Sequence, residues 1–386
     1  MKKKAPLFAL ILCALLLVTV LVLRGVQSEE IWPESQYPEG WPACVMQPAP
    51  SPAGTPAPVY EEQLYLISVV GDCTLASPQF IDPSEHRSIE HHIGKDYAYP
   101  FSNTREYFAD DDLTIANLEC NLSDVKLFSY EQFSFSAPTE YAEILKEGGV
   151  DFVTTANNHI QDFGAGGEEF TYMALEDHGI PYGKDGEAKL ITTESGLTVG
   201  IYCAWNHQEP DPDQAVAAIR RLRADGAEFV ICAFHWGKEL VYKPFDSQTE
   251  LAHRCIDAGA DLIYGSHSHC LQPVEEYHNR LILYSMGNWV FGGSTKPSDM
   301  DTAIIQVHLK RGTDGMVRYV DYTVVPCCVS SRPVKENYSG ENYNDYRPTP
   351  YTEGSNAYNR VLAKLEGSFT PDSEGRDYSD VYAQYG

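Results

Sequence analysis

The chain has 386 residues, of which 43% are hydrophobic, so it is long enough to build a large core in one or more domains. It carries 55 acidic against 28 basic residues, a formal net charge of −27. A surface this acidic repels phosphate backbones, which argues against nucleic-acid binding and favours solubility outside the cell.

Residues 1–28 contain the first recognisable segment. Lys2, Lys3 and Lys4 precede the uncharged stretch Ala5–Leu23, and Arg24 follows it. As a helix this stretch spans about 28 Å, close to the hydrocarbon thickness of a bilayer. The flanking lysines predict a single-pass anchor in the cell membrane, with a cytoplasmic amino terminus and an extracellular remainder. The alternative is a cleaved signal peptide, whose apolar stretch is usually shorter, about 7–15 residues.

The anchor is followed by three further regions. Residues 29–60 are rich in proline and form a semi-extended linker. Residues 61–330 are the predicted globular domain, and residues 331–386 are a polar carboxyl-terminal extension. Within that extension we expect a short helix at Asn356–Leu365 and loose order at Tyr338–Pro350 and in the last twenty residues.

Five short apolar runs in the domain read as buried strands, and each one ends in a polar cluster. They are Leu64–Val70 before Gly71-Asp72, Leu113–Ala116 before Asn117-Leu118-Glu119, Asp151–Ala156 before Asn157-Asn158-His159, Glu228–Phe234 before His235-Trp236-Gly237, and Asp261–Gly265 before Ser266-His267-Ser268-His269. Open α/β sheets collect their ligands at the carboxyl ends of strands. The five clusters are therefore expected to meet at one site.

Helical patterns alternate with these strands, and further strands follow them. The predicted helices are Tyr141–Glu147, Gly166–His178, Asp213–Asp225 and Ser247–Ala258, and the later strands are Leu281–Val290, Thr302–Leu309 and Met316–Val325. The glycine-containing turn Arg311–Gly315 makes the last two strands a hairpin. This order predicts an α/β fold with two sheets face to face and helices outside.

The ten cysteines do not form a recognisable framework, because they include no CxxC pair and no regular spacing. Cys73, Cys203, Cys232 and Cys270 lie in or beside apolar strands, as small buried hydrophobes do. Whether the adjacent Cys327 and Cys328 form disulfides is left open.

The residue types in the polar clusters are those that hold Zn, Mn, Fe or Mg. His267 and His269 form the strongest pair, since on an extended strand both would point to one face. Asp162, three residues after His159, is placed to orient that imidazole. Taken singly, an Asp at a strand end is more often a turn cap, and a lone His is more often a core residue. Together the donors suit two divalent cations about 3.5–4 Å apart and hydrolysis or transfer at a phosphoryl or acyl centre.

These motifs, in this order, resemble the CapA family of poly-γ-glutamate capsule biosynthesis proteins, which have a calcineurin-like metallophosphoesterase fold. The resemblance covers roughly Leu64 to Val325 and includes the additional segments His235-Trp236-Gly237-Lys238-Glu239 and Tyr284-Ser285-Met286-Gly287-Asn288-Trp289-Val290-Phe291. It implies a four-layer α/β/β/α sandwich with an acid–base role for His159. It also implies a ligand set of Asp72, Glu119, Asn158, His235, His267 and His269. Thr74 stands where the wider superfamily usually has a further histidine ligand.

Polar neighbours of the ligands are predicted to contact substrate. They are Asn117, Asn157, Lys238, Glu239 and Asn288. The resemblance implies a part in making, exporting or trimming poly-γ-glutamate at the cell surface. Two hypotheses follow, a metal-dependent hydrolase or transferase and a non-enzymatic component of a membrane synthase complex that holds the polymer or partner subunits.

Overall fold

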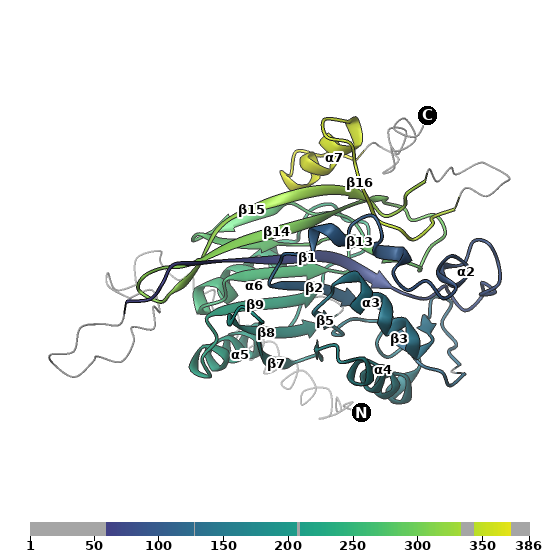
Figure 1. The fold of residues 1–386 in the computed structure, drawn as a ribbon, viewed down its shortest axis with the longest axis horizontal. Helices are drawn as coiled ribbons and strands as arrows, with labels where there is room; N and C mark the ends of the chain where they lie inside the picture. The colour runs from purple at the N-terminus through teal and green to yellow at the C-terminus, as the bar shows by residue number, and fades with distance from the viewer. Residues whose placement is uncertain (1–58, 127, 207–208, 333–342, 372–386) are drawn as a thin grey trace, which may run out of the picture. The chain divides into compact units, whose positions relative to one another are not determined.

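Two β-sheets make up the centre of the part of the chain that the computed structural model describes, residues 59–126, 128–206, 209–332 and 343–371 (Figure 1). The first sheet has eight strands in the order β16-β15-β14-β1-β2-β5-β6, with β13 also paired to β1. Their bounds are β1 Gln63–Thr74, β2 Leu113–Leu118, β5 Phe152–Thr154, β6 Tyr182–Gly183, β13 Asn288–Phe291, β14 Asp301–Arg311, β15 Val317–Cys328 and β16 Thr349–Pro350.

The second sheet has six strands in the order β11-β12-β10-β9-β8-β7. Their bounds are β7 Glu187–Thr192, β8 Thr198–Trp205, β9 Phe229–His235, β10 Leu262–Ser266, β11 Val274–Tyr277 and β12 Arg280–Leu283, and a separate pair is formed by β3 Asn121–Leu122 and β4 Ser136–Ala137. β1, β2, β5 and β6 are mutually parallel, as are β8, β9, β10 and β12. All the predicted strand tips that carry metal donors therefore belong to parallel strands.

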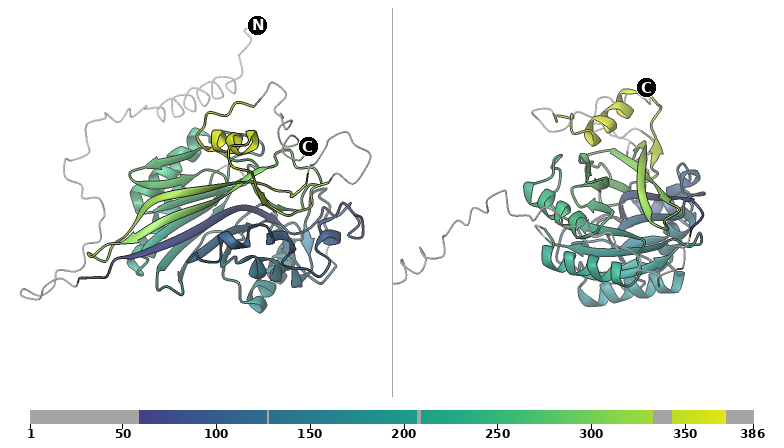
Figure 2. Two further views of the ribbon diagram at one scale, coloured as in Figure 1. Left: turned by 45° about the horizontal axis from the view of Figure 1, so that its top comes forward. Right: turned by 90° about the vertical axis from the view of Figure 1, so that its left-hand side faces the viewer.

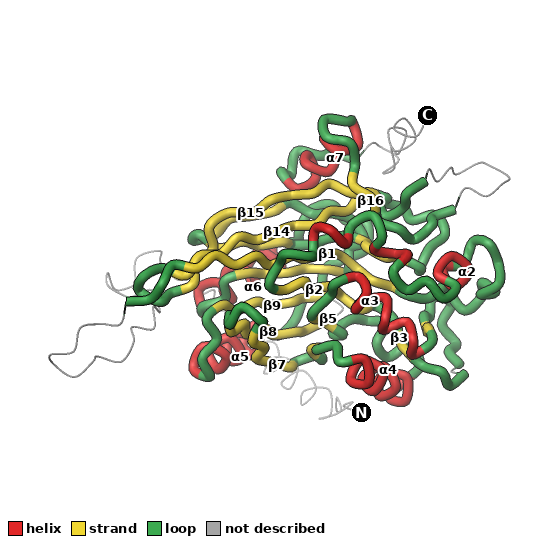
Figure 3. The backbone as a smooth tube through the Cα atoms, in the orientation of Figure 1, coloured by secondary structure: helices red, strands yellow, loops and turns green. Residues whose placement is uncertain are grey.

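The helices lie outside the strands (Figure 3). They are α2 Ile89–Ile93, α3 Ala142–Gly148, α4 Gly164–His178, α5 Pro212–Ala224, α6 Asp246–Ala258 and α7 Asn356–Leu365, with 3₁₀ turns at Tyr99–Phe101, Arg105–Tyr107 and Thr139–Tyr141. α5 begins where Asp211 caps the backbone N–H groups of residues 213 and 214 and Pro212 takes the first turn. Its Ile219 and Leu222 are buried, and each such side chain stabilises the fold by about 1.5–3 kcal/mol.

The two-residue period of the strands sorts their side chains between two cores. In β9, Phe229 and Ile231 pack between the two sheets, whereas Val230 and Phe234 pack against α5 and α6. On the other side, apolar residues of β2 pack with α3 and α4 in a separate core. The layers thus run α3/α4, first sheet, second sheet, α5/α6, which matches the predicted mixed α/β architecture.

The predicted strand Leu281–Val290 is instead two strands in two different sheets. β12 ends at Leu283 in the second sheet, and β13 begins at Asn288 in the first. Gly287, at φ 64°, makes the crossing, and its carbonyl accepts a hydrogen bond of 2.9 Å from the backbone N–H of Asp72. Both strands are buried and rich in apolar residues, and Ser285, Gly287 and Asn288 at their junction mark the break.

The carboxyl-terminal part of the described chain is packed more closely than predicted. Asn344, Asp345 and Tyr346 lie in the segment expected to be loose, yet all three are buried. α7 has the predicted bounds, lies beyond β15 and β16 in both Figure 1 and Figure 2, and buries Val361 and Leu365 in the core.

Three predictions concern other features of the chain. The anchor at residues 1–28 and nearly all of the linker lie outside the described residues. Within the described part of the chain, no helix combines the length and the apolar character needed to span a bilayer. The eight described cysteines, including Cys327 and Cys328, are buried, and no disulfide forms among them.

Candidate metal centre

The donors from four strand ends converge into two overlapping groups. One group contains Glu119, His235 and His267, and the other contains Asp72, Glu119 and His269. Within each group, one donor atom per residue lies within 4.8 Å of the others. Glu119 belongs to both groups and so joins them into one cluster.

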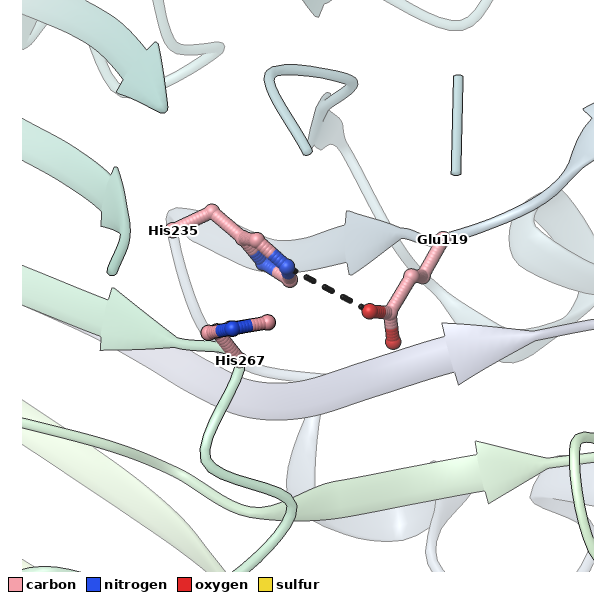
Figure 4. Close-up of side chains that lie close together, drawn as sticks. All are labelled: Glu119, His235 and His267. Carbon is pink, nitrogen blue, oxygen red and sulfur yellow. Dashed lines mark ion pairs between the residues drawn. The ribbon is translucent and has the colours of Figure 1, made fainter. Parts of the chain in front are cut away.

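The first group combines one carboxylate with two imidazoles (Figure 4). Glu119 Oε1 lies 3.4 Å from His235 Nε2, and both side chains are almost completely buried. Glu119 Oε1 and His267 Nδ1 have no hydrogen-bond partner within the described residues. Buried polar atoms without partners are costly, and a carboxylate oxygen facing imidazole nitrogens is a donor set that a divalent cation would satisfy. The residues present therefore fit a metal.

The second group lies where β1 meets the turn after β10. Asp72 Oδ2 is 3.4 Å from His269 Nδ1, which is 4.0 Å from Glu119 Oε2. Asn117 donates a hydrogen bond of 2.8 Å to the other oxygen of Asp72. This bond orients the carboxylate so that one oxygen stays directed at the histidine.

Asn158, which follows β5, places a neutral oxygen beside the first group. Its Oδ1 lies 2.7 Å from His235 Nε2. His235 Nδ1 lies 2.8 Å from the hydroxyl of Ser266, so the opposite ring nitrogen faces the cluster. The sequence analysis assigned no role to Ser266, although its position directly before His267 indicated that it would lie close to the cluster.

The two histidines after β10 adopt a conformation that the sequence analysis did not anticipate. β10 ends at Ser266, and His267 and His269 have φ values of 94° and 53°. The prediction that an extended strand carries both imidazoles on one face is therefore wrong. Positive φ in residues other than glycine costs on the order of 1–3 kcal/mol each and is concentrated at functional sites. A strained turn, not a strand, brings the two rings to the cluster.

The pKa shifts of the three histidines in the cluster differ, so that two imidazoles are neutral and one is charged near pH 7. Burial, with a smaller effect of neighbouring histidines, lowers the pKa of His267 to about 4 and that of His235 well below its ordinary value. Both are therefore neutral near pH 7, the form that ligates metals. Burial acts against a charge on His269 too, but Glu119 and Asp72 outweigh it and raise its pKa to about 10. Burial and then Asp72 raise the pKa of Glu119 to about 8.

A pocket of about 290 Å³ opens beside the cluster. His159 lines it, with Nδ1 3.0 Å from Asp162 Oδ2 and its ring against Phe135, the centroids 4.8 Å apart. Burial lowers the pKa of His159, but the hydrogen bond to Asp162 and the charge of Glu119 outweigh it, so the net shift is upward. The same Asp162 oxygen also accepts the backbone N–H of Phe135 at 2.9 Å.

The predicted substrate contacts divide into two sets. Glu239 and Asn288 line the pocket, whereas Asn117, Asn157 and Lys238 are not among its lining residues. Asn157 is fully buried and donates to Asn117 Oδ1 and to the carbonyl of Leu118, so the two amides brace the ends of β2 and β5.

Two further pocket residues contact the candidate metal ligands directly. Asn288 lies 2.9 Å from His269 Nδ1 and also orients that ring. Thr74 lines the pocket and donates a hydrogen bond of 3.4 Å to Glu119 Oε2, at the place of the usual extra histidine. The aromatic lining formed by Phe133, Phe135 and Phe291 was not predicted.

A comparison with models of protein families shows which family the chain belongs to. The model described as "Bacterial capsule synthesis protein PGA_cap" matches residues 66–293, more than half of the sequence. The chain belongs to this family, the CapA family to which its motifs pointed.

Individual relatives agree with the family assignment. The chain is 28% identical over 337 residues to "Capsule biosynthesis protein CapA" of Bacillus anthracis, covering 80% of this chain and 74% of that one. It is 30% identical over 239 residues to "PGA biosynthesis protein CapA" of Bacillus subtilis, covering 56% of this chain and 62% of the relative. A "Probable polyglutamine synthesis accessory protein" of Mycobacterium tuberculosis is 29% identical over 166 residues, which are 35% and 43% of the two chains.

Solved structures show only a distant likeness. A hypothetical protein from Thermus thermophilus matches with a TM-score of 0.42 and 15% identity, over 68% of this chain and 98% of that one. An NAD nucleotidase from Haemophilus influenzae matches with a TM-score of 0.43 and 12% identity, over 84% and 60%. Similarity at this level does not bear on function.

Proposed function

We propose that this protein is a metal-dependent hydrolase or transferase of the metallophosphoesterase type that acts on poly-γ-glutamate or a related cell-surface polymer in capsule biosynthesis. The observation that carries the proposal is the sharing of Glu119 between two donor groups, with a buried carboxylate oxygen and a buried imidazole nitrogen lacking partners within the described residues. The names of the Bacillus relatives supply the biological setting.

Six side chains would hold the metal, which we expect to be two divalent ions of Mn, Zn, Fe or Mg. They are Asp72, Glu119, Asn158, His235, His267 and His269. Such ions would supply Lewis-acid activation of a phosphoryl or carbonyl oxygen. The mixed nitrogen and oxygen donors suit transition metals better than calcium.

The remaining chemistry belongs to the chain's own side chains. Asp162 holds Nδ1 of His159, which leaves the other ring nitrogen for proton transfer in the pocket. Phe135 packs against the His159 ring and limits its rotation. Together these contacts position an acid–base group beside the metal ligands, as an acyl or phosphoryl transfer requires.

The setting we propose for this catalyst is the outer face of the cell membrane. Residues 1–28 would anchor the chain with its amino terminus in the cytoplasm, and residues 29–60 would space the domain of residues 61–330 from the bilayer. The polar residues 331–386 would extend that domain. Alkaline phosphatase fused after residue 60 tests the orientation, since it is active only outside the cytoplasm.

One observation favours the alternative of a non-enzymatic component that binds polymer or synthase subunits. Thr74 stands at a usual ligand position and its hydroxyl contacts Glu119 instead of offering an imidazole. A site with fewer nitrogen ligands holds one of its metals less tightly.

Metal analysis and turnover separate the two functions. The purified full-length chain is assayed for bound metal and for chelator-sensitive cleavage of bis(p-nitrophenyl) phosphate and of a γ-glutamyl anilide. An enzyme loses turnover but keeps metal in His159→Ala, while Gln161→Ala, an exposed neighbour, behaves as the parent does. A metal-free chain that still binds polymer is the result expected of a scaffold.

A further inference from the structure

The lining of the pocket beside the candidate metal ligands contains acidic side chains but neither lysine nor arginine, which is unusual for a protein proposed to act on the polyanion poly-γ-glutamate. The acids are Glu119 and Glu239. The aromatic rings of Phe133, Phe135 and Phe291 form much of the remaining wall. Proteins that bind strings of carboxylates or phosphates normally pair them with lysine or arginine. Beside Glu239, away from the candidate metal ligands, this pocket therefore favours a positive group over a negative one.

Glu239 is the acid of the pocket that the metal cluster does not use. Its side chain is exposed and forms no ion pair with any described residue, although Lys238 is its neighbour in sequence. Its charge nevertheless reaches the cluster, since it helps Glu119 and Asp72, whose effects are larger, to raise the pKa of His269 against the opposing effect of burial. A free carboxylate thus stands at the pocket within electrostatic range of the metal ligands.

The backbone around Glu239 is held on both sides. Before it, the fully buried Trp236 donates a hydrogen bond of 2.9 Å to the carbonyl of Tyr284. After it, the N–H of Leu240 donates a bond of 2.7 Å to the carbonyl of Ser268, between the two ligand histidines. The carboxylate is therefore presented by a fixed turn, as a recognition group should be.

We infer that this pocket accepts the amino-terminal residue of an amide-linked chain, with the free ammonium group of that residue paired to Glu239 and its linking carbonyl placed over the metal ligands. The inference rests on the proposed function and specifies its substrate. An internal segment of a polyanion would set carboxylates against Glu239, and the pocket lining has no lysine or arginine to offset the repulsion. A terminal ammonium gains an ion pair there and contacts with aromatic rings.

The reaction on such a substrate is hydrolysis of the first amide bond. The oxygen of water bonds to the carbonyl carbon, the C–N bond breaks, and the departing nitrogen takes a proton that His159 is placed to deliver. The products are one free amino acid and a chain shortened by one residue. No oxidant or further co-reactant is needed.

The test compares two probes on the full-length protein loaded with Mn²⁺ or Zn²⁺. One is a γ-linked glutamate trimer with a free amino terminus, and the other is the same trimer acetylated on that nitrogen. The parent should cleave the free trimer at least about tenfold more efficiently, through KM, since a charge-assisted contact is lost on acetylation. Glu239→Gln should abolish this preference, while Lys238→Gln, its neighbour outside the pocket, should retain it.

The possible outcomes distinguish failure of the inference about the terminal ammonium from failure of the proposed hydrolase function. Equal cleavage of both trimers by the parent, or an equal loss on both in Glu239→Gln, overturns the inference and leaves the hydrolase intact. If the loaded parent cleaves neither trimer, the proposed function fails for amides, and calorimetric binding decides the inference. Tighter binding of the free trimer that depends on Glu239 supports it, and equal binding overturns it.

Discussion

Glu119 and His235 meet across the two sheets, with Oε1 of the carboxylate 3.4 Å from Nε2 of the imidazole. Glu119 directly follows β2 of the first sheet, and His235 is the last residue of β9 in the second. The candidate metal centre therefore lies at the seam between the sheets. Its geometry depends on how the sheets pack as well as on the ligands themselves.

The hydroxyl of Ser266 should tune metal affinity through His235. It lies 2.8 Å from Nδ1 and fixes which ring nitrogen faces the cluster. Loss of such an outer partner typically costs about 10–100-fold in metal affinity. Ser266→Ala should therefore weaken metal binding by that factor, measured by competition with a fluorescent chelator.

Ser268→Ala is the matched control for this variant. Ser268 is buried in the same segment, but its hydroxyl bonds to Ser285 and to the carbonyl of Cys270. The metal affinity of Ser268→Ala should stay within about twofold of that of the parent, a difference in binding free energy below about 0.5 kcal/mol. Equal losses in both variants would mean that the segment, not the hydrogen bond to His235, sets the affinity.

Gly71 is required where β1 and β13 approach each other. A Cβ atom at this position would lie 2.0 Å from the carbonyl oxygen of Gly287, a backbone atom that cannot rotate away. Overpacking of this kind costs about 1–3 kcal/mol. Gly71→Ala should lower the free energy of unfolding by about 3 kcal/mol in urea titrations and also reduce bound metal, since Asp72 is the next residue.

The matched control is Gly166→Ala in α4, where a Cβ meets no atom within 4 Å. Alanine in a helix stabilises by about 0.5–1 kcal/mol relative to glycine. A Gly71→Ala variant as stable as the parent would show that β13 moves aside, and the register between Asp72 and Asn288 would then not be fixed by close packing.

Local pattern was enough to predict the strands that carry the ligands. β1, β2, β9 and β10 each begin within two residues of a predicted apolar run, because a strand buried on both faces reads as a continuous apolar segment. α5 and α6 were predicted from helical periodicity and from the glycines that end them. These strands and helices can be predicted because their patterns depend only on residues close together in the sequence.

What could not be predicted depends on contacts between distant residues. The change of sheet at Gly287 depends on the packing of Gly71 against it, which joins positions more than two hundred residues apart. The positive φ of His267 and His269 has no sequence signal, because histidine does not favour that region as glycine does. Phe133 and Phe135 also line the pocket, but their segment has no helical or strand periodicity from which this could be predicted.

Lys364 should be essential for stability because it neutralises two buried carboxylates. Its Nζ lies 2.7 Å from both Asp299 Oδ2 and Asp301 Oδ2, and all three side chains are almost completely buried. Removing one partner of a buried ion pair costs about 3–5 kcal/mol, because the other charge is left without compensation. Here Asp299 loses its ion pair, while Asp301 keeps its two bonds to Arg360. Lys364→Met should show a loss of that size in urea unfolding.

An exposed pair provides the comparison for Lys364. Arg254 lies 2.7 Å from Asp213, with half or more of each side chain exposed. Such pairs contribute about 0–1 kcal/mol, so Arg254→Met should be nearly neutral. If Lys364→Met is equally mild, the ion pairs of Lys364 do not hold α7 to the sheet.

The last prediction concerns pH. Burial raises the pKa of Asp111 to about 6. Nearby Asp151 and Asp112 add to the effect, and the hydroxyls of Ser68 and Thr114 oppose it. An acid whose pKa is higher in the folded state destabilises the fold when it is ionised. The penalty is absent below the unfolded pKa of about 4, grows as the pH rises to about 6, and is complete above that value.

Asp111→Asn should remove this penalty while its amide oxygen still accepts the hydroxyl of Thr114, which lies 2.6 Å from the carboxylate. A shift of about two units corresponds to about 3 kcal/mol, which partial exposure reduces to about 1–2 kcal/mol. The variant should therefore exceed the parent by this amount in urea unfolding at pH 8 and match it at pH 4. Asp110→Asn, at an exposed neighbour, should follow the parent at both values. An Asp111→Asn advantage that is the same at pH 4 and pH 8 would show that Asp111 is not the titrating group.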